Sequence, residues 1–318
     1  MLRSLLAVLS RSCSLPACLL VCLALTACGT TGPAPLSGQA SAAQFCDRPQ
    51  VHDARTQDRL LRFAAIVRDE LNDSGEQVAL ISRSGIDLAY LGIRYSHSGV
   101  SVKGDGDGPW SVRQLYYACD EGRPRLYDQG IAGFLFNSDD AQVGYVSIVL
   151  LPHEEAADLQ RTALDRPRAL RLLAGRYSAN AYPFSTRYQN CNQWVNELMA
   201  TAWGRLDDGA DLRERAQAWL AGGGYAPAPI DLGSHRLKFA AAFMPLVHLD
   251  DHPEEARYGL NYRVSLPEAM ESFVRERMPQ AKRIELCHDD RQVVIRRGWQ
   301  PIAAGCRPEA GDRVIALG

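Results

Sequence analysis

The sequence predicts an α+β protein in which an antiparallel β-sheet packs against α-helices. Two kinds of pattern carry this prediction. Apolar residues recur on a helical period in segments such as 54–72 and 191–199, which is typical of amphipathic helices. Short runs of β-branched and apolar residues bounded by turn residues indicate strands, and residues 92–118 read as a β-hairpin.

The N-terminal half begins with a helix and continues with strands. The helix, 54–72, has a buried face made of Leu60, Phe63, Ala64, Val67 and Leu71. Residues 77–83 predict a strand. The hairpin follows, with a first arm at 92–103 and a second arm at 110–118. Its turn, 104–108, alternates Gly and Asp, the residues that tolerate the positive backbone angles of a tight turn.

The middle of the chain predicts one more strand and two helices. Residues 143–151 predict the strand and residues 154–164 a helix. A polar and aromatic loop, 176–190, then leads into a helix that starts at Cys191, with Asn190 as the predicted N-cap. The buried stripe of this helix consists of Trp194, Val195, Leu198 and Met199.

The C-terminal part is less regular. A short helix is expected at 211–220, and the Gly- and Pro-rich segment 222–229 marks a break. Beyond it, a helix is expected near 267–277. Two strands are expected near 283–287 and 292–297.

The N-terminus reads as a bacterial export signal. Arg3 and Arg11 are its only charges, and residues 15–27 are uncharged and mostly apolar. This run is short for a membrane span but suits a signal peptide. Residues 25–28 resemble a lipobox, which predicts cleavage before Cys28 and a lipid on its thiol. Ordinary cleavage after Ala27 is the alternative, but it requires a small residue where Leu25 stands.

We therefore expect residues 1–27 to be a lipoprotein signal peptide and Cys28 to anchor the protein to a membrane. Residues 28–45 predict a flexible tether. Gly29 follows the lipidated position where the usual sorting rule places Asp for inner-membrane retention, which favours the periplasmic face of the outer membrane.

Charge and hydropathy exclude some classes of function. The formal net charge is -2, and removing Arg3 and Arg11 gives -2 - 2 = -4. This mild acidity gives no indication of nucleic-acid binding. No second stretch is long and apolar enough for a transmembrane helix. The sequence does not indicate an oligomeric state.

The cysteine count points to one thiol without a partner in the chain. Of nine cysteines, three lie in the signal and Cys28 is expected to carry lipid, so 9 - 3 - 1 = 5 remain. Export to an oxidising compartment permits disulfides. We expect one between Cys287 and Cys306, near the ends of C-terminal strands, and by elimination one between Cys46 and Cys119. Cys191 is then left over, as a candidate reactive thiol.

Cys191 and His97 are the candidate catalytic pair. A cysteine at a helix start lies near unpaired backbone N–H groups, which favour a thiolate and can stabilise an oxyanion. His97 lies in a predicted strand between small residues that would leave its ring accessible, so it is the candidate base. The alternative interpretation is that Cys191 is a buried structural thiol and His97 an ordinary core residue.

Four segments carry a resemblance to known proteins. Residues 95–100 (YSHSGV) and 190–195 (NCNQWV) resemble the motifs of the permuted NlpC/P60 papain-like superfamily, in which the His strand precedes the Cys helix. With the strand 110–114 and the segment 247–253, the chain resembles a bacterial family of unknown function, DUF2145.

The superfamily resemblance, over residues 76–205, implies an antiparallel half-barrel sheet packed on the Cys helix. It implies a permuted NlpC/P60 core at 46–205 and a C-terminal extension, 206–318, packed on that core. It also implies a third polar residue that orients the imidazole, for which Gln114 is the candidate, although Gln is weaker at this than Asp or His.

The function implied by the resemblance is thiol-dependent hydrolysis or acyl transfer in the cell envelope. Related families act on peptide, amide or lipid-ester bonds, so the expected substrate is a peptide or an acyl chain, and no cofactor is expected. The alternative is a non-catalytic envelope protein that keeps the fold for binding or assembly.

Two further groups leave alternatives open. His248, Asp250, Asp251 and His252 have side chains that could bind a divalent metal, but no regular element fixes their spacing, so we interpret the segment as a solvated loop. The aromatic residues before Cys191 line a cleft or belong to the core. They are Tyr182, Phe184 and Tyr188.

Overall fold

The computed structural model describes residues 51–104, 108–138 and 140–317. The predicted signal 1–27, Cys28, the tether and Cys46 lie outside the described residues. Among the described residues, no helix is both long and apolar enough to cross a membrane.

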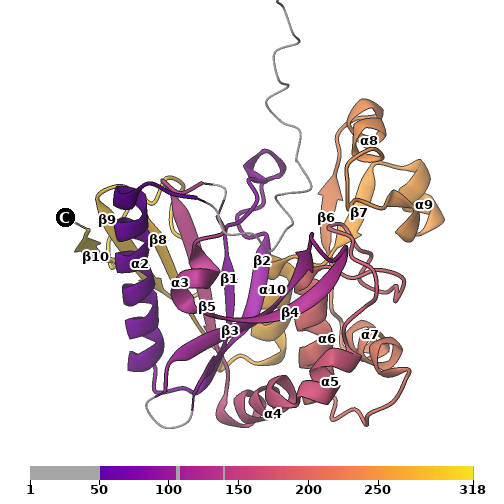
Figure 1. Ribbon diagram of the computed structural model, residues 1–318, viewed down its shortest axis with the longest axis horizontal. Helices are drawn as coiled ribbons and strands as arrows, with labels where there is room; N and C mark the ends of the chain where they lie inside the picture. Colours follow the sequence, from indigo (N-terminus) through magenta and orange to yellow (C-terminus); the bar gives the residue numbers. More distant parts are fainter. Residues whose placement is uncertain (1–50, 105–107, 139, 318) are drawn as a thin grey trace, which may run out of the picture. The chain divides into compact units, whose positions relative to one another are not determined.

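One antiparallel sheet organises the described chain (Figure 1). Its eight strands follow the order β10-β9-β8-β5-β1-β2-β3-β4, and each neighbouring pair is antiparallel. The strands are β1 (Val78–Arg83), β2 (His97–Lys103), β3 (Trp110–Ala118), β4 (Arg123–Gly130), β5 (Gly144–Leu150), β8 (Lys282–His288), β9 (Gln292–Arg297) and β10 (Arg313–Ala316). The C-terminal strands thus continue the sheet that the hairpin begins.

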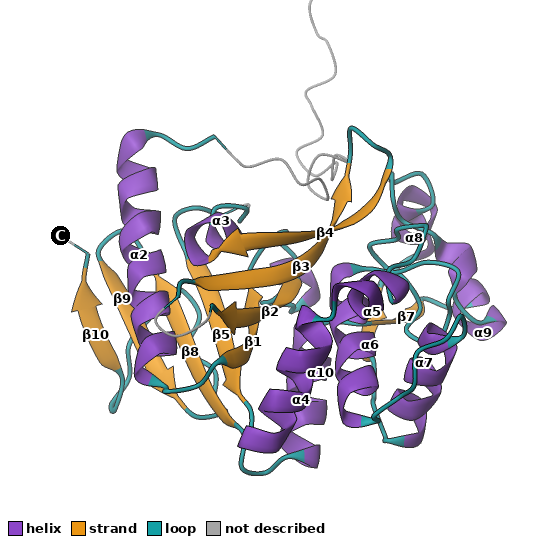
Figure 2. Cartoon of the chain, turned by 60° about the horizontal axis from the view of Figure 1, so that its bottom comes forward, coloured by secondary structure: helices purple, strands orange, loops and turns teal. Residues whose placement is uncertain are grey.

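Helices cover both faces of the sheet (Figure 2). On one face, α2 (Ala54–Asp73) and the short α3 (Ile131–Leu135) bury apolar side chains against β1, β3 and β5. The other face is covered by α4 (His153–Leu164), α5 (Arg166–Arg171), α6 (Cys191–Trp203) and α10 (Pro267–Arg277). Helix α7 (Leu212–Gly222) packs beside α6.

A second, smaller sheet lies in the C-terminal part. It pairs β6 (Ala228–Asp231) with β7 (Asn261–Val264), and α8 (His235–Ala241), η3 (Leu249–Asp251) and α9 (Glu254–Tyr258) lie between them in the chain. One further helical turn, η2 (Ala89–Leu91), lies in the connection from β1 to β2.

The sequence located most of the long elements. The predicted helices at 54–72, 154–164 and 267–277 and the strands at 77–83 and 143–151 are confirmed to within two residues. The first hairpin arm is shorter than predicted, because residues 92–96 belong to the connection from β1. Among the elements that the sequence did not indicate are β4 and α3, which lie beside the candidate site.

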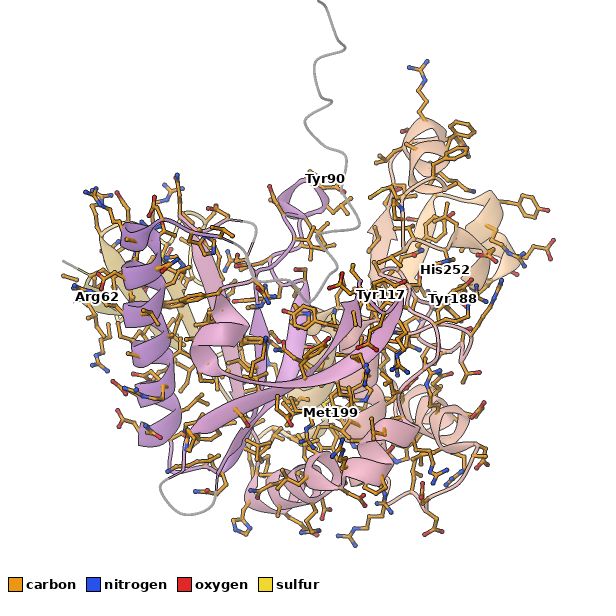
Figure 3. The ribbon with its side chains drawn as sticks, in the orientation of Figure 1. Arg62, Tyr90, Tyr117, Tyr188, Met199 and His252 are labelled. Carbon is orange, nitrogen blue, oxygen red and sulfur yellow. A yellow bond between two sulfur atoms is a disulfide. The ribbon has the colours of Figure 1, made fainter. Side chains whose placement is uncertain are left out.

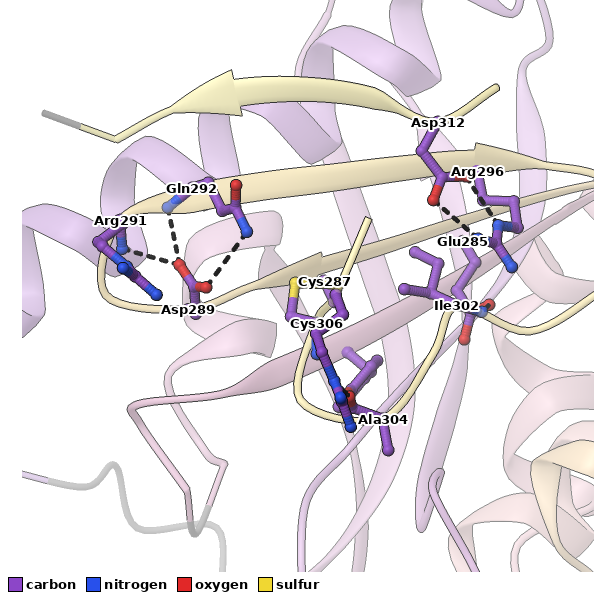
Figure 4. Close-up of a disulfide and its surroundings, with 12 residues drawn as sticks. Glu285, Cys287, Asp289, Arg291, Gln292, Arg296, Ile302, Ala304, Cys306 and Asp312 are labelled. Carbon is purple, nitrogen blue, oxygen red and sulfur yellow. Dashed lines mark hydrogen bonds and ion pairs between the residues drawn. A yellow bond between two sulfur atoms is a disulfide. The ribbon is translucent and has the colours of Figure 1, made fainter. Parts of the chain in front are cut away.

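The disulfide predicted between Cys287 and Cys306 is confirmed (Figure 4). Their Cα atoms are 5.6 Å apart, and both residues are fully buried in a small apolar cluster with Val294 and Ile302. Cys119 is also disulfide-bonded. Cys46 lies outside the described residues, so its pairing with Cys119 stays a prediction.

Candidate active site

Cys191 is the first residue of α6, as the sequence predicted. The side-chain oxygen of Asn190 accepts a hydrogen bond from the backbone N–H of Gln193 at 2.7 Å, which caps the helix. Of the described cysteines, Cys191 is the free one. The free thiol therefore lies at the first turn of a helix, where backbone N–H groups have no partner within the helix.

His97 is held by a chain of side-chain hydrogen bonds. Its Nε2 atom lies 2.7 Å from Oε1 of Gln114, and Nε2 of Gln114 donates to Oε1 of Gln129 at 2.7 Å. With the Gln114 amide oxygen facing the ring and its nitrogen facing Gln129, the ring proton lies on Nε2 and the lone pair on Nδ1. The structure brings together His97 and Gln114, the candidate that orients it.

The backbone pairing between β2 and β3 ends before it reaches His97. Strand β2 pairs with β1 along its length, but with β3 only from Val100 to Lys103. Beyond the Val100–Arg113 pair, β3 continues against β4 alone. Residues 97–99 of β2 are therefore unpaired with β3, although the strands stay close: the side chains of His97 and Gln114 meet here, and Gly99 packs against Val112.

The Cys191 thiol lies against the backbone that flanks His97. Its sulfur is 3.9 Å from the carbonyl oxygen of Ser96, and the backbone N–H groups of Ser98 and Asn192 lower the pKa of the thiol. Two hydrogen bonds from the side chain of Asn192 hold the start of α6 against the residues on either side of His97. The Nδ2 atom of Asn192 donates to the carbonyl of Ser96 at 3.2 Å, and its Oδ1 accepts from the Ser98 hydroxyl at 2.8 Å.

Cys191 and His97 lie on opposite faces of the sheet, at the place where the β2–β3 ladder ends. Successive side chains of a strand alternate between faces. Ser98 contacts α6, whereas the ring of His97 stacks on Tyr116 at 4.5 Å and lies 5.9 Å from Phe134 of α3. Among the described residues, no hydrogen bond joins the Cys191 thiol to the His97 ring.

Burial keeps both groups neutral. Burial raises the pKa of the Cys191 thiol to about 11, although backbone N–H groups oppose it, so burial favours the neutral thiol over the thiolate. Burial, with a contribution from Arg83, lowers the pKa of His97 to about 3. The expectation of an accessible ring was wrong, because Tyr116 and α3 leave His97 only 7% exposed.

Arg83 is a site residue that the sequence analysis missed. It ends β1, pairs in register with His97, and is buried. Its guanidinium donates to the hydroxyl of Tyr116, the residue on which His97 stacks. A charged residue at the end of an otherwise apolar run was the available signal in the sequence.

The loop that precedes Cys191 is fixed by the segment that we had interpreted as a solvated loop. That interpretation was wrong: Asp251 accepts hydrogen bonds from the Tyr182 backbone and the Ser185 hydroxyl, and both Asp251 and His252 are buried. His252 lies 2.7 Å from the carbonyl oxygen of Asn180. Figure 3 labels His252 and Tyr188, which come from these two segments. The contacts join residues about 70 positions apart, which local sequence does not reveal.

The aromatic residues before Cys191 divide between two environments. Tyr188 is buried, and its ring stacks on that of His248 at 4.2 Å. Phe184 is partly buried against Tyr225 and its apolar cluster, and the ring of Tyr182 lies 5.7 Å from that of His252. These contacts place the aromatic residues in the packing of the loop.

A buried ion pair anchors the same loop from the other side. Glu197 of α6 accepts from Arg213 of α7 at 2.8 Å and from Nε2 of Gln189 at 2.6 Å. Arg213 also donates to the carbonyl oxygens of Thr186 and Tyr188. This network connects α6, α7 and the loop, and therefore fixes where α6 begins.

The described part of the chain contains no cluster of three or more His, Cys, Asp or Glu side chains that could hold a metal ion. Two polar pockets lie at the far end of α6, near Trp203 and Arg205, away from Cys191. The groups in contact with the Cys191 sulfur are the Ser96 carbonyl and the Asn192 side chain, whereas His97 and Arg83 both contact Tyr116.

Comparison with known proteins identifies the family. Residues 70–274 match the family model described as an uncharacterized protein conserved in bacteria, DUF2145, and this range includes Arg83, His97, Gln114 and Cys191. No curated protein and no solved structure matches the chain. Because the match spans more than half of the chain, the protein belongs to the bacterial DUF2145 family.

Proposed function

We propose that this protein is a thiol-dependent hydrolase or acyltransferase of the cell envelope, with the core of a permuted NlpC/P60 papain-like enzyme. The observation that carries the proposal is that Cys191 and His97 flank the same place in the sheet, where the β2–β3 ladder ends. The Cys191 thiol lies against one side of it, and His97, already oriented by Gln114, lies at the other.

In the proposed reaction, the sulfur of Cys191 attacks a substrate carbonyl carbon and its proton passes to Nδ1 of His97. Because the two side chains lie on opposite faces of the sheet, this transfer requires residues 97–99 to move. The backbone N–H of Cys191 donates to the oxyanion. When the tetrahedral intermediate collapses, the leaving group takes the proton from His97. Water or an acceptor alcohol or amine then attacks the thioester while its proton passes to His97. The acid, ester or amide product leaves, and the departing sulfur takes that proton back to regenerate the thiol.

The neutral resting pair is compatible with this chemistry if the site opens. Burial is the largest cause of both pKa shifts, so entry of water or of a polar substrate moves both back toward their ordinary values. In the periplasm, the raised pKa of Cys191 would also make the thiol less prone to oxidation, because the thiolate is the reactive form.

The proposed location follows from the export signal and lipobox at Cys28. A lipid anchor, followed by the tether 28–45, would hold the site close to the periplasmic face of the outer membrane, within reach of a peptide or lipid substrate.

One set of observations favours the second candidate, a non-catalytic binding or assembly protein. Cys191 and His97 are both buried and neutral, and their side chains leave the backbone on opposite faces of the sheet. In that case Cys191 would be a core residue of α6 and His97 a packing residue beneath Tyr116.

Alkylation of the native protein separates the two candidates. We expect iodoacetamide to modify Cys191 faster than the protein unfolds, and His97→Ala to slow the reaction. The matched control is the double variant Cys191→Ala/Ala202→Cys, which moves the thiol to another buried position on α6. Equal rates for Cys191 and the Ala202→Cys thiol, both limited by unfolding, would favour the binding protein.

A further inference from the structure

Arg83 is a buried cation for which the structure describes no ion-pair partner. The residue is 3% exposed, and its guanidinium faces the ring of Phe134 at 5.3 Å but forms no ion pair with a described carboxylate. The other buried arginines differ. Arg213 is 2.8 Å from Glu197, and Arg283 is 2.8 Å from Glu271. A buried charge without a counter-ion is costly, so its presence beside a candidate active site requires a reason.

Hydrogen bonds orient the guanidinium of Arg83, but some of its N–H donors have no acceptor. Nη1 donates to the carbonyl oxygen of Ser84 at 3.0 Å, and Nη2 donates to the hydroxyl of Tyr116 at 2.7 Å. Nε is buried and has no hydrogen-bond partner. Since a guanidinium carries five N–H groups, three remain without an acceptor among the described residues.

The backbone leaves room for this guanidinium. A Cβ atom at Gly85 would lie 2.8 Å from Nη1 of Arg83 and 2.7 Å from Oγ of Ser96. Any side chain at position 85 would therefore displace the charged group. Tyr116, which also accepts from Asn137 at 3.3 Å, fixes the other end. The group is held in place before any ligand arrives, as an ion-binding site requires.

We propose that Arg83 binds an anionic oxygen group of the substrate, a carboxylate or a phosphate, beside the Cys191–His97 site. The planar fork of a guanidinium matches both groups, and binding would supply the missing counter-ion. The inference deepens the proposed function by naming a substrate class, and it rests on that function for the identity of the ligand as a substrate.

Ligand binding would also change His97. Burial is the main cause of the lowered pKa of His97, and the charge of Arg83 lowers it further. An anion on Arg83 would offset that charge and make His97 a stronger base. Binding of the correct substrate would therefore prepare the site for proton transfer.

The test measures the melting temperature, Tm, of the whole protein in sodium acetate, sodium phosphate and sodium chloride at equal ionic strength. We expect acetate, phosphate or both to raise the Tm of the wild type above its value in chloride by about 2–4 °C, and to do the same for Cys191→Ala. Arg83→Met should not show this rise in Tm. Because general salt effects on burial act on both proteins, the difference between the variant and the wild type reports binding at Arg83.

Arg83→Met should also melt at a higher temperature than the wild type in chloride, because it removes an uncompensated charge. Arg283→Met is the matched control and should melt lower, since it leaves Glu271 and Glu285 without their partner. If Arg83→Met does not fold, Arg83→Lys replaces it. It keeps the charge without the fork and should show a smaller rise.

A rise with acetate alone assigns a carboxylate, and a rise with phosphate alone assigns a phosphate. The proposal is overturned if no anion raises the Tm of the wild type, or if the Arg83 variant shows the full rise. Because Cys191→Ala is expected to respond as the wild type does, the result is independent of whether Cys191 is catalytic.

Discussion

The Nε2 atom of His97 and the Oε1 atom of Gln114 lie 2.7 Å apart, and this contact determines which ring nitrogen is free to act. Gln129 accepts from the amide nitrogen of Gln114 and so fixes its orientation. The Nδ1 atom of His97 is consequently the proton acceptor. The Gln114–His97 pair is the part of the proposed site that is fully formed, whereas the Cys191 contact still requires the site to open.

Gln114→Glu is expected to raise the pKa of His97 from about 3, because a carboxylate in place of the amide stabilises the imidazolium. A titration of the ring nitrogens by NMR measures this shift. Gln129→Glu is the matched control, since it introduces the same charge one hydrogen bond farther away and should raise the pKa less. Equal shifts in the two variants would contradict the direct His97–Gln114 contact.

The protein is expected to lose stability as the pH falls below about 6.5. Burial lowers the folded-state pKa of His97 from 6.5 to about 3 and that of His288 to about 4. Below pH 6.5 the unfolded chain therefore binds protons at these histidines that the folded state does not bind, which favours unfolding. For His97 the shift, 6.5 - 3 = 3.5, corresponds to a loss of up to about 5 kcal/mol by pH 3.

Urea unfolding at a series of pH values measures this dependence. His97→Gln should flatten the curve between pH 6.5 and 4, whereas substitution of the exposed His153 should leave it unchanged. An equally steep curve in His97→Gln would show that the ring of His97 is not the group responsible.

Asn192→Ala is expected to loosen the contact between the Cys191 helix and strand β2. It removes the hydrogen bonds to Ser96 and Ser98 and should lower the free energy of unfolding by about 1–3 kcal/mol. Asn196→Ala, on the same helix, is the control, because it removes a buried hydrogen bond to Tyr225 instead.

The two variants should differ in the reactivity of Cys191. Asn192→Ala should change the alkylation rate of the native thiol, and Asn196→Ala should not. The same rate change in both would mean that reactivity follows stability alone and that Asn192 has no positioning role.

Loss of the Cys287–Cys306 disulfide should destabilise the C-terminal strands. The sequence separation is 19, and the chain-entropy relation gives a cost of about 3 kcal/mol for a loop of this size. The double variant Cys287→Ala/Cys306→Ala, unfolded in urea, measures the loss. The wild type in reductant should unfold at the same lower urea concentration. Unchanged stability in both would contradict a structural role for the disulfide.

Sequence reasoning located the parts of the site that depend on local signals. The start of α6 was predicted from Asn190 as N-cap and from the apolar stripe after Cys191, and both features need only one turn of helix. Likewise, β3 was predicted from its own residues, and Gln114 with it. The free thiol followed from counting, and it is confirmed among the described cysteines.

The features of the site that the sequence did not reveal depend on contacts between residues that are distant in sequence. Helix α3, which covers His97, has only five residues, too few to show a helical period in the sequence. Strand β4 contains Pro124, which an edge strand tolerates but which weakens the strand signal in the sequence. The missing counter-ion of Arg83 and the burial of Asp251 depend on tertiary neighbours. The faces on which Cys191 and His97 lie depend on strand register, which the sequence pattern did not specify.

The most direct test of the account is covalent capture of an acyl group. Native protein mixed with p-nitrophenyl acetate is analysed by intact mass and peptide mapping. We predict acetylation of Cys191, and a rate about 10²-fold lower in His97→Ala because the base is missing. A Cys191 that stays unmodified in the native protein, but becomes acetylated once the protein is denatured, would contradict the proposed activity.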